Sequence, residues 1–222
     1  DVMSLGIHRA WKEKFIDWMN PQTGTNLIDV ASGTGDIAKL FLNKTSKSGQ
    51  ITCVEPNAQM LNQGKKKLKK YNNIKWINAS AEKIPTKDNV YDYYSISYGI
   101  RNVSDINNVL KEAFRVLKPD GNIIITMPFL FKLHGEPNDY QRWTEYKLKK
   151  ILMEAGFSNI EIKRLGGFWS VLADLIKIKI SAIRWRWLAL FFGALFVPLQ
   201  YFFIEVLEKF LSSHHSKEWP LH

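Results

Sequence analysis

The fold of this chain follows from Asn26-Leu27-Ile28-Asp29-Val30-Ala31-Ser32-Gly33-Thr34-Gly35-Asp36, an apolar run that enters a glycine-rich turn. The amphipathic segment 37–42 comes directly after it, so the order predicts a strand, a tight turn and a helix. Gly33 and Gly35 would let the backbone pass close to a ligand, because a Cβ at either place would clash or forbid the dihedral angles of the turn. The first N–H groups of the helix would then point at that ligand.

The rest of the first two thirds of the chain alternates between apolar runs and amphipathic segments. This alternation predicts the α/β class, with a doubly wound, mostly parallel sheet whose loops gather at one edge. We expect helices at 6–19, 37–43, 56–70, 104–117 and 144–155, and further strands at 51–54, 74–78, 90–96, 122–127 and 160–162. The run 118–121 predicts a Pro-x-Gly turn after a helix. Six strands would leave an exposed edge.

The residues around the turn indicate which ligand it binds. A dinucleotide site requires G-x-G-x-x-G, and no third glycine follows Gly35 in the predicted helix. Asp29 precedes the turn, where a carboxylate can hold an ammonium group. Glu55 ends the next apolar run, at the distance expected for an acid that binds ribose hydroxyls. An acid for an ammonium, an acid for a ribose and no pyrophosphate cradle favour S-adenosyl-L-methionine over NAD. The alternative is a purely structural turn, with Thr34 capping the helix.

Composition limits the class of protein further. The 222 residues carry a formal net charge of +10, which favours an anionic partner such as a phospholipid surface or nucleic acid. The one cysteine, Cys53, lies in a predicted buried strand, so we expect neither disulfides nor a metal cluster. This cysteine usage fits a reducing compartment, and no signal peptide is visible. We therefore expect a cytoplasmic protein.

At this point four motifs carry a resemblance. They are Asp1-Val2-Met3-Ser4-Leu5-Gly6-Ile7-His8-Arg9, the run 29–36 quoted above, Ser97-Tyr98-Gly99-Ile100-Arg101-Asn102-Val103 and Arg115-Val116-Leu117-Lys118-Pro119-Asp120-Gly121. Through them, residues 1–126 resemble the ubiquinone/menaquinone biosynthesis C-methyltransferases, a branch of the class I S-adenosylmethionine-dependent methyltransferases. The resemblance implies a Rossmann-like fold and methyl transfer to a prenylated quinol. It also implies cofactor contacts at Thr34, Glu55, Ser80, Ala81 and Ser97.

The chain departs from that family in two ways. The family usually has Asp where Glu55 stands, and Asn or Asp where Ser80 stands. Residues 128–165, with His134, Gly135, Asp139 and Arg142, instead resemble the broader methyltransferase type 11 group, so the acceptor half looks different from the cofactor half. The beginning and end of the chain also look incomplete against the family. The type 11 resemblance allows another lipid or glycan intermediate as the acceptor.

C-methylation of a quinol needs a ring made electron-rich by loss of a phenolic proton. Arg101 is a poor base because a guanidinium group stays protonated, but it can stabilise a phenolate through a charge-assisted hydrogen bond. His8, His134 and Asp139 are candidate bases on segments that we expect to fold over the cofactor. For each of these four residues the alternative is a capping, bracing or surface role.

The C-terminal part differs in composition from the rest, and we expect a methyltransferase domain over 1–165 and an apolar helical appendage over 166–222. Residues 185–204 are apolar over about the length that spans a bilayer, but Arg186, Gly193 and Pro198 interrupt the run. The aromatic residues Trp185, Trp187 and Tyr201 stand beside clustered cations. This pattern favours helices at a membrane surface, with peripheral attachment to the inner face. The alternative is a cap on the domain or on a second subunit in a homo-oligomer.

Three other functions remain open on the sequence alone. A NAD-dependent oxidoreductase is disfavoured by the glycine pattern. An RNA methyltransferase is suggested by the charge, but the loop 97–100 lacks the Asn-Pro-Pro-Tyr-like sequence of enzymes that methylate base nitrogens. A non-catalytic, membrane-bound assembly partner that keeps the cofactor fold is the third. A hydrophobic small molecule or lipid is therefore the acceptor that we expect.

Overall fold

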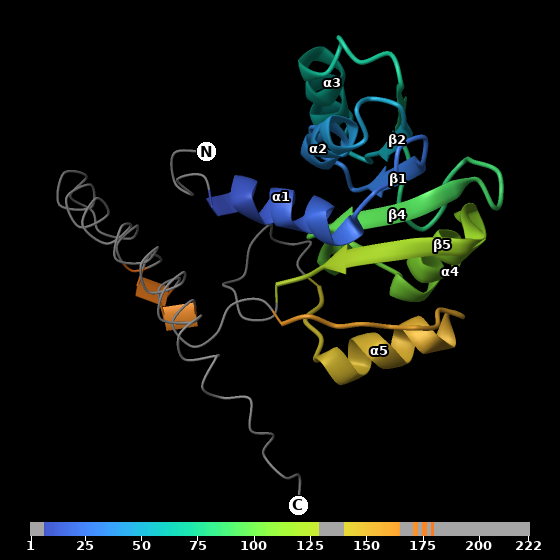
Figure 1. Cartoon of the computed structure of the whole chain (residues 1–222). Helices are drawn as coiled ribbons and strands as arrows, with labels where there is room; N and C mark the ends of the chain where they lie inside the picture. Colours follow the sequence, from blue (N-terminus) through green and yellow to red (C-terminus); the bar gives the residue numbers. More distant parts are fainter. Residues whose placement is uncertain (1–6, 129–139, 165–170, 173–174, 177–178, 180–222) are drawn as a thin grey trace, which may run out of the picture. The chain divides into compact units, whose positions relative to one another are not determined.

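The computed structural model describes residues 7–128 and 140–164, together with residues 171–172, 175–176 and 179 (Figure 1). The chain divides into two compact units. The first comprises residues 1–129 with 133–160, and the second comprises residues 130–132 with 161–222. All the strands described belong to the first unit. The boundary that we predicted at 165/166 stays a prediction.

A single parallel sheet forms the centre of the first unit. Its strands lie in the order β3-β2-β1-β4-β5. They are β1 (Asn26–Val30), β2 (Gln50–Val54), β3 (Ile74–Ile77), β4 (Tyr91–Ser97) and β5 (Leu117–Thr126). Every neighbouring pair is parallel, so all five carboxyl ends meet at one edge of the sheet. This confirms the doubly wound parallel sheet predicted from the alternation of apolar runs and amphipathic segments.

Alternate residues of β1 enter two separate hydrophobic cores. Leu27 packs on one face with Phe15, Ile37 and Phe41, from the first two helices. Ile28 and Val30 point to the opposite face, into a core that includes residues of α4. The nearly continuous apolar sequence of β1 follows from this burial on both faces, because a strand covered by helices on each side has no solvent face to mark with polar residues.

Most of the described helices lie in connections between strands, as predicted, whereas the first precedes β1 and the last follows β5. The helices are α1 (Ile7–Met19), α2 (Asp36–Lys44), α3 (Ala58–Lys67), α4 (Ile106–Val116) and α5 (Glu145–Glu154), with a 3₁₀ helix, η1 (Gly99–Asn102). Side chains cap three of them: Asn57 accepts from the backbone N–H groups of Gln59 and Met60, Asp105 from Asn108, and Thr144 from Lys147. Each cap satisfies N–H groups that the first helical turn leaves without partners.

The structure corrects two predictions in the second half. Residues 160–162 form no strand, and among the described residues the sheet has five strands rather than six. The strand β5 begins at Leu117, earlier than predicted, because Leu117 already pairs with Tyr91. The register then jumps, so that Tyr93 pairs with Asn122, and the predicted Pro-x-Gly turn lies within this irregularity.

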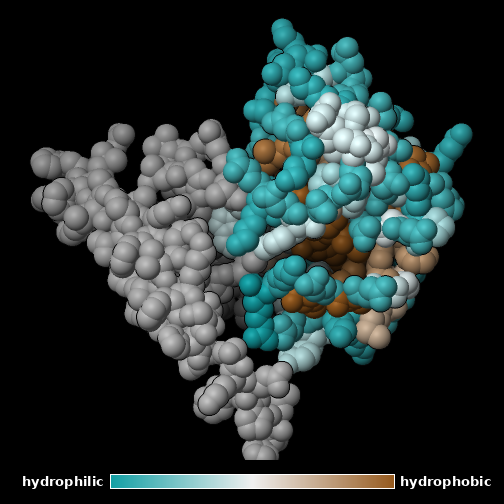
Figure 2. Space-filling view, viewed as in Figure 1, coloured by the Kyte–Doolittle hydropathy of each residue, from teal (hydrophilic) through white to brown (hydrophobic). Residues whose placement is uncertain are grey.

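The edge strand β5 carries a run of isoleucines. Ile123, Ile124 and Ile125 of β5 are only half-buried. Figure 2 shows hydrophobic residues gathered in a hollow on the viewed face, with hydrophilic residues around it.

In the part of the chain that the structure describes, there is no helix both long and apolar enough to cross a membrane. The segment 185–204, which we expected at a membrane surface, lies outside the described residues.

Candidate functional site at the carboxyl edge of the sheet

A cavity of about 290 Å³ opens at the carboxyl ends of β1 and β4. Its lining includes Asp29, Gly33, Thr34 and Ser97, four of the residues predicted to bind the cofactor. The other lining residues, which the sequence analysis did not single out, are Lys12, Ala31, Ser32, Asp36, Ile37, Met60 and Tyr98. The cavity therefore lies where an open α/β sheet binds its ligand.

Asp29 is the buried acid of this cavity, with 1% of its surface exposed. Ser95, on the neighbouring strand β4, donates a hydrogen bond from Oγ to Asp29 Oδ1 over 2.7 Å. The second oxygen, Oδ2, has no hydrogen-bond partner among the described residues. Burial raises the pKa of Asp29 to about 7, although the Ser95 hydrogen bond and the charge of Lys12 lower it. A cationic group entering the cavity would satisfy Oδ2 and favour the ionised carboxylate.

The glycine turn has the backbone geometry expected for it. Gly33 and Gly35 have φ of +56° and +77°, in the left-handed region that side chains disfavour. A Cβ on Gly35 would lie 2.8 Å from both Leu68 Cδ1 and Trp76 Cη2, so this glycine is required by protein packing as well as by dihedral angle. Gly35 is also the N-cap of α2 and supplies no side-chain cap. The alternative role of Thr34 as the cap of this helix is therefore wrong.

Glu55 binds one backbone N–H group in the glycine turn and another at the start of α3. Its Oε2 accepts from Gly33 N over 2.8 Å, and its Oε1 accepts from Asn57 N over 2.9 Å. The side chain is buried and is not part of the cavity lining. These two bonds hold the turn against the start of α3. A carboxylate has about four acceptor positions, so each oxygen can also accept from a ribose hydroxyl. The predicted ribose contact stays a prediction.

Two residues at the carboxyl edge other than glycine adopt left-handed backbone conformations. Ala31 follows β1 with φ +52°, and Tyr98 follows β4 with φ +62°. Both line the cavity. The adjacent Gly99 is necessary because a Cβ there would lie 2.4 Å from the Cβ of Ala31. Such costly conformations concentrate at functional sites, and no local signal in the sequence marked these two residues.

A charge cluster forms the rim of the cavity. Lys12 Nζ of α1 lies 2.5 Å from Asp36 Oδ2, and Lys67 Nζ of α3 binds Asp36 Oδ1. Burial alone would raise the pKa of Asp36, but the hydrogen bonds and charges of the two lysines outweigh it and lower the pKa to about 2. One carboxylate thus joins three helices that are distant in sequence. Periodicity gave no indication of this cluster, because all three residues lie on polar helix faces.

Ser80 and Ala81 lie on the segment after β3 and do not line the cavity. Ser80 is exposed, whereas Ala81 is 6% exposed and packs in the hydrophobic core. The following residue, Glu82, accepts hydrogen bonds from Ser104 N and Ser104 Oγ, each over 3.0 Å. The predicted contact of Ser80 and Ala81 with the adenine ring stays a prediction.

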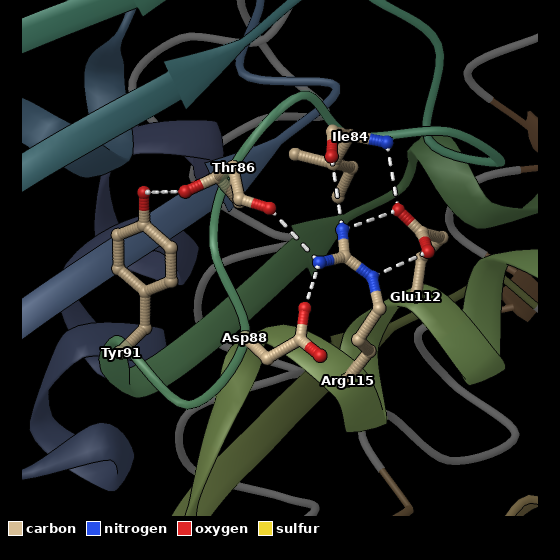
Figure 3. A network of polar contacts seen from close by, with 6 residues as sticks. All are labelled: Ile84, Thr86, Asp88, Tyr91, Glu112 and Arg115. Atoms are coloured by element: carbon tan, nitrogen blue, oxygen red, sulfur yellow. Dashed lines mark hydrogen bonds and ion pairs between the residues drawn. The ribbon is translucent and has the colours of Figure 1, made fainter.

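Arg115 fixes the end of this segment to α4 (Figure 3). Its guanidinium donates to both carboxylate oxygens of Glu112, each over 2.8 Å. It also donates to the backbone oxygens of Ile84 and Thr86 and to Asp88 Oδ1. All five N–H donors of the side chain are used, which explains structurally why arginine stands at this position of the motif 115–121.

Of the four predicted catalytic residues, Arg101 is the one whose side chain the structure describes. Arg101 is buried in η1, on the loop that follows β4, and its backbone oxygen accepts from Tyr140 N over 3.2 Å. It is not part of the cavity lining. His8 lies in α1, but its side chain is outside the description, and His134 and Asp139 are outside the described residues altogether. Their catalytic roles stay predictions.

The donors and acceptors of the cavity fit the amino acid portion of S-adenosylmethionine. An unsatisfied buried carboxylate oxygen at Asp29 suits its ammonium group, and the lysine beside Asp36 supplies positive charge at the rim.

Across residues 7–128 and 140–164, no cluster of His, Cys, Asp and Glu side chains could hold a metal ion. Cys53 is buried and burial raises its pKa, so its thiol stays protonated.

Comparison with known proteins identifies the family. Residues 1–150 match the model of the ubiE/COQ5 methyltransferase family. A protein of Bartonella quintana named ubiquinone/menaquinone biosynthesis C-methyltransferase UbiE is 35% identical over 214 residues, covering 80% of this chain and 82% of the relative. The protein of that name from Rickettsia prowazekii is 48% identical over 130 residues, which are 56% of this chain and 52% of the relative. The chain thus spans about half the length of the Rickettsia relatives it matches.

The fold matches solved structures at lower sequence identity. A SAM dependent methyltransferase from Aquifex aeolicus superposes with a TM-score of 0.58 at 23% identity, over 69% of this chain and 81% of that one. This similarity establishes the Rossmann-like methyltransferase fold. Together with the family match, which covers more than half of the chain, it leads to one conclusion: the chain belongs to the ubiE/COQ5 methyltransferase family.

Proposed function

We propose that this protein transfers a methyl group from S-adenosyl-L-methionine to a ring carbon of a prenylated quinol, in the biosynthesis of ubiquinone or menaquinone. The family match and the names of the relatives support the reaction. The structural observation on which the proposal rests is Asp29 Oδ2, a buried acceptor without a partner in the described structure, in a cavity under a two-glycine turn. A pyrophosphate would bring negative charge to this carboxylate, whereas an amino acid brings an ammonium.

Residues of the cavity and of the loops that follow β2 and β3 divide the binding of the cofactor among them. Asp29 receives the ammonium, and the backbone of the turn at Gly33 and Gly35 allows the ligand to approach closely. Glu55 binds the ribose hydroxyls, and Ser80 and Ala81 lie against the adenine. When bound, the sulfonium supplies an electrophilic methyl group. The work left for the protein is to place the acceptor in line with it and to exclude water.

The acceptor side depends on the loop after β4. Arg101 stabilises the phenolate of the quinol by a charge-assisted hydrogen bond, because a guanidinium stays protonated and cannot act as the base. His8, His134 and Asp139 are the candidates for removing the phenolic proton. A prenylated acceptor is dissolved in a membrane, so the protein works at a membrane surface, and the apolar, cation-flanked segment 185–204 provides the contact.

Radiolabelled methyl transfer into total membrane lipid tests the function directly. Purified protein is incubated with labelled S-adenosyl-L-methionine and a lipid extract, and the labelled species is identified by chromatography and mass spectrometry. We expect label in a quinol ring, and none with Asp29→Asn, which removes the acceptor for the ammonium. Label in a different lipid or in a glycan intermediate would identify that molecule, rather than a quinol, as the acceptor. Cofactor binding without any transfer would indicate a non-catalytic assembly partner.

A further inference from the structure

The floor of the cavity favours a cation, and its rim favours an anion. At the floor, Asp29 presents a buried oxygen without a described partner. At the rim, Lys12 pairs with the carboxylate of Asp36, and Lys67, which is not part of the lining, binds the same carboxylate. Only one of these lysines is neutralised by that carboxylate, so the cluster keeps a net positive charge. An amino acid has the matching pair of groups, an ammonium and a carboxylate on the same carbon.

Of the two lysines, Lys12 is the one that reaches the cavity. Lys12 lines the cavity, whereas Lys67 binds Asp36 and Thr34 Oγ1 and is not part of the lining. An ammonium group has three donors, and the bond to Asp36 uses one of them. The salt bridge therefore holds the Lys12 side chain at the rim while leaving donors for a second, anionic partner.

The start of α2 adds to the positive potential at the same place. Gly35 is the N-cap residue of this helix, so the cap has no side chain that could satisfy the first N–H groups. The lining residues Asp36 and Ile37 belong to this first turn. Helix N-termini attract anions through these N–H groups and the helix dipole, and here the effect adds to the charge of Lys12.

We propose that Lys12 binds the α-carboxylate of the cofactor's amino acid and makes the site selective for nucleosides that carry this carboxylate. The inference rests on the proposed function, since it assumes that the amino acid enters the cavity with its ammonium at Asp29. It assigns a binding role to α1, a helix whose apolar residues Phe15, Ile16 and Met19 otherwise pack in the core beneath it.

The test compares two ligands that differ in the carboxylate alone. They are S-adenosylhomocysteine and its decarboxylated analogue, S-adenosyl-3-thiopropylamine, measured by calorimetry with the full chain. We expect wild type to prefer the carboxylate-bearing ligand by ~10-fold or more, the range of a charge-assisted hydrogen bond. Lys12→Met should bind the two ligands within about twofold of each other. Lys12→Arg, which keeps the cation, should retain most of the preference.

Lys12→Met also removes the salt bridge between Lys12 of α1 and Asp36 of α2. A second ion pair joins the same two helices and serves as the control for this loss. Lys44 Nζ lies 2.7 Å from Asp17 Oδ1, and neither residue lines the cavity. Lys44→Met should therefore leave the ligand preference unchanged. If Lys12→Met keeps the preference, or weakens both ligands equally, the role of Lys12 is overturned while the proposed function stands. If wild type binds neither ligand, the proposed function fails instead.

Discussion

Ser95 and Asp29 lie side by side on the adjacent parallel strands β4 and β1, and the Ser95 hydroxyl donates to Asp29 over 2.7 Å. Both side chains are almost fully buried. The bond occupies one carboxylate oxygen and leaves the other for the cavity, so it orients Asp29 as well as favouring its ionised form. Sixty-six residues separate the two positions, and only the pairing of the strands brings them together.

The first prediction concerns the pH dependence of cofactor binding. Because the pKa of Asp29 is raised to about 7, the carboxylate is protonated below that pH and ionised above it. An ammonium binds the ionised form, so the affinity for S-adenosylhomocysteine should rise between pH 5.5 and 8, with a midpoint near 7. Asp29→Asn should bind more weakly at pH 8 and show a flat profile. Calorimetry over this range measures both, and 5′-methylthioadenosine, which lacks the ammonium, is the control ligand.

The second prediction isolates Ser95. Its hydrogen bond lowers the pKa of Asp29 against the effect of burial, so Ser95→Ala should move the midpoint of that pH profile upward. Ser97→Ala is the matched control on the same strand, because the Ser97 hydroxyl pairs with Thr126 Oγ1 rather than with Asp29. Ser97 lines the cavity, so this change can alter the affinity itself, but it should leave the midpoint of the pH profile where it is in wild type. An unchanged midpoint in Ser95→Ala would show that Ser95 does not tune the acid.

The third prediction separates packing from backbone conformation in the glycine turn. Gly24 and Gly35 have similar left-handed φ values, +81° and +77°, but an added Cβ meets nothing within 4 Å at Gly24 and meets Leu68 and Trp76 at 2.8 Å at Gly35. Gly24→Ala should cost about 1 kcal/mol of unfolding free energy, the conformational term alone. Gly35→Ala should cost ~1–3 kcal/mol more from overpacking, measured by urea unfolding. Equal losses of unfolding free energy in the two variants would show that side-chain packing does not require a glycine at position 35.

The fourth prediction concerns the network around Arg115. Arg115→Met removes a half-buried guanidinium that satisfies Glu112 and two backbone oxygens, and should cost ~2–4 kcal/mol of unfolding free energy. The matched control is Lys118→Met, which breaks a single ion pair with Asp92 in a more exposed place and should cost less than ~1 kcal/mol. A loss below that of the control would show that Arg115 does not fix the loop to α4.

The fifth prediction tests the role proposed for Arg101. Arg101→Ala should leave the affinity for S-adenosylhomocysteine nearly unchanged, because Arg101 does not line the cavity. It should lower methyl transfer at least ~10-fold if the guanidinium stabilises the phenolate. Arg101→Lys keeps the charge and should recover part of the rate. Full turnover in Arg101→Ala would remove this residue from the mechanism, whereas loss of cofactor binding would point to a structural role.

Local signals in the sequence were sufficient for the elements that depend on local chemistry. The caps at Asn57, Asp105 and Thr144 join backbone groups only two or three residues away. The glycine turn was predicted for the same reason, since its dihedral angles are set by the residues within it. The prediction at 160–162 failed because a short apolar run resembles a strand whether or not a neighbouring strand pairs with it.

The sequence by itself determined the class of the fold, the place of the cavity at the edge where β1 ends, and the acid that lies beneath it. Alternation of apolar runs and helices, with one glycine-rich turn, admits few other arrangements. Tertiary structure alone decided that Ser95 holds Asp29, that Lys12 stands at the rim through Asp36, and that Glu55 binds the turn itself. These contacts join residues that are 22 to 66 positions apart. No periodicity records such pairs, because they depend on which strands and helices become neighbours.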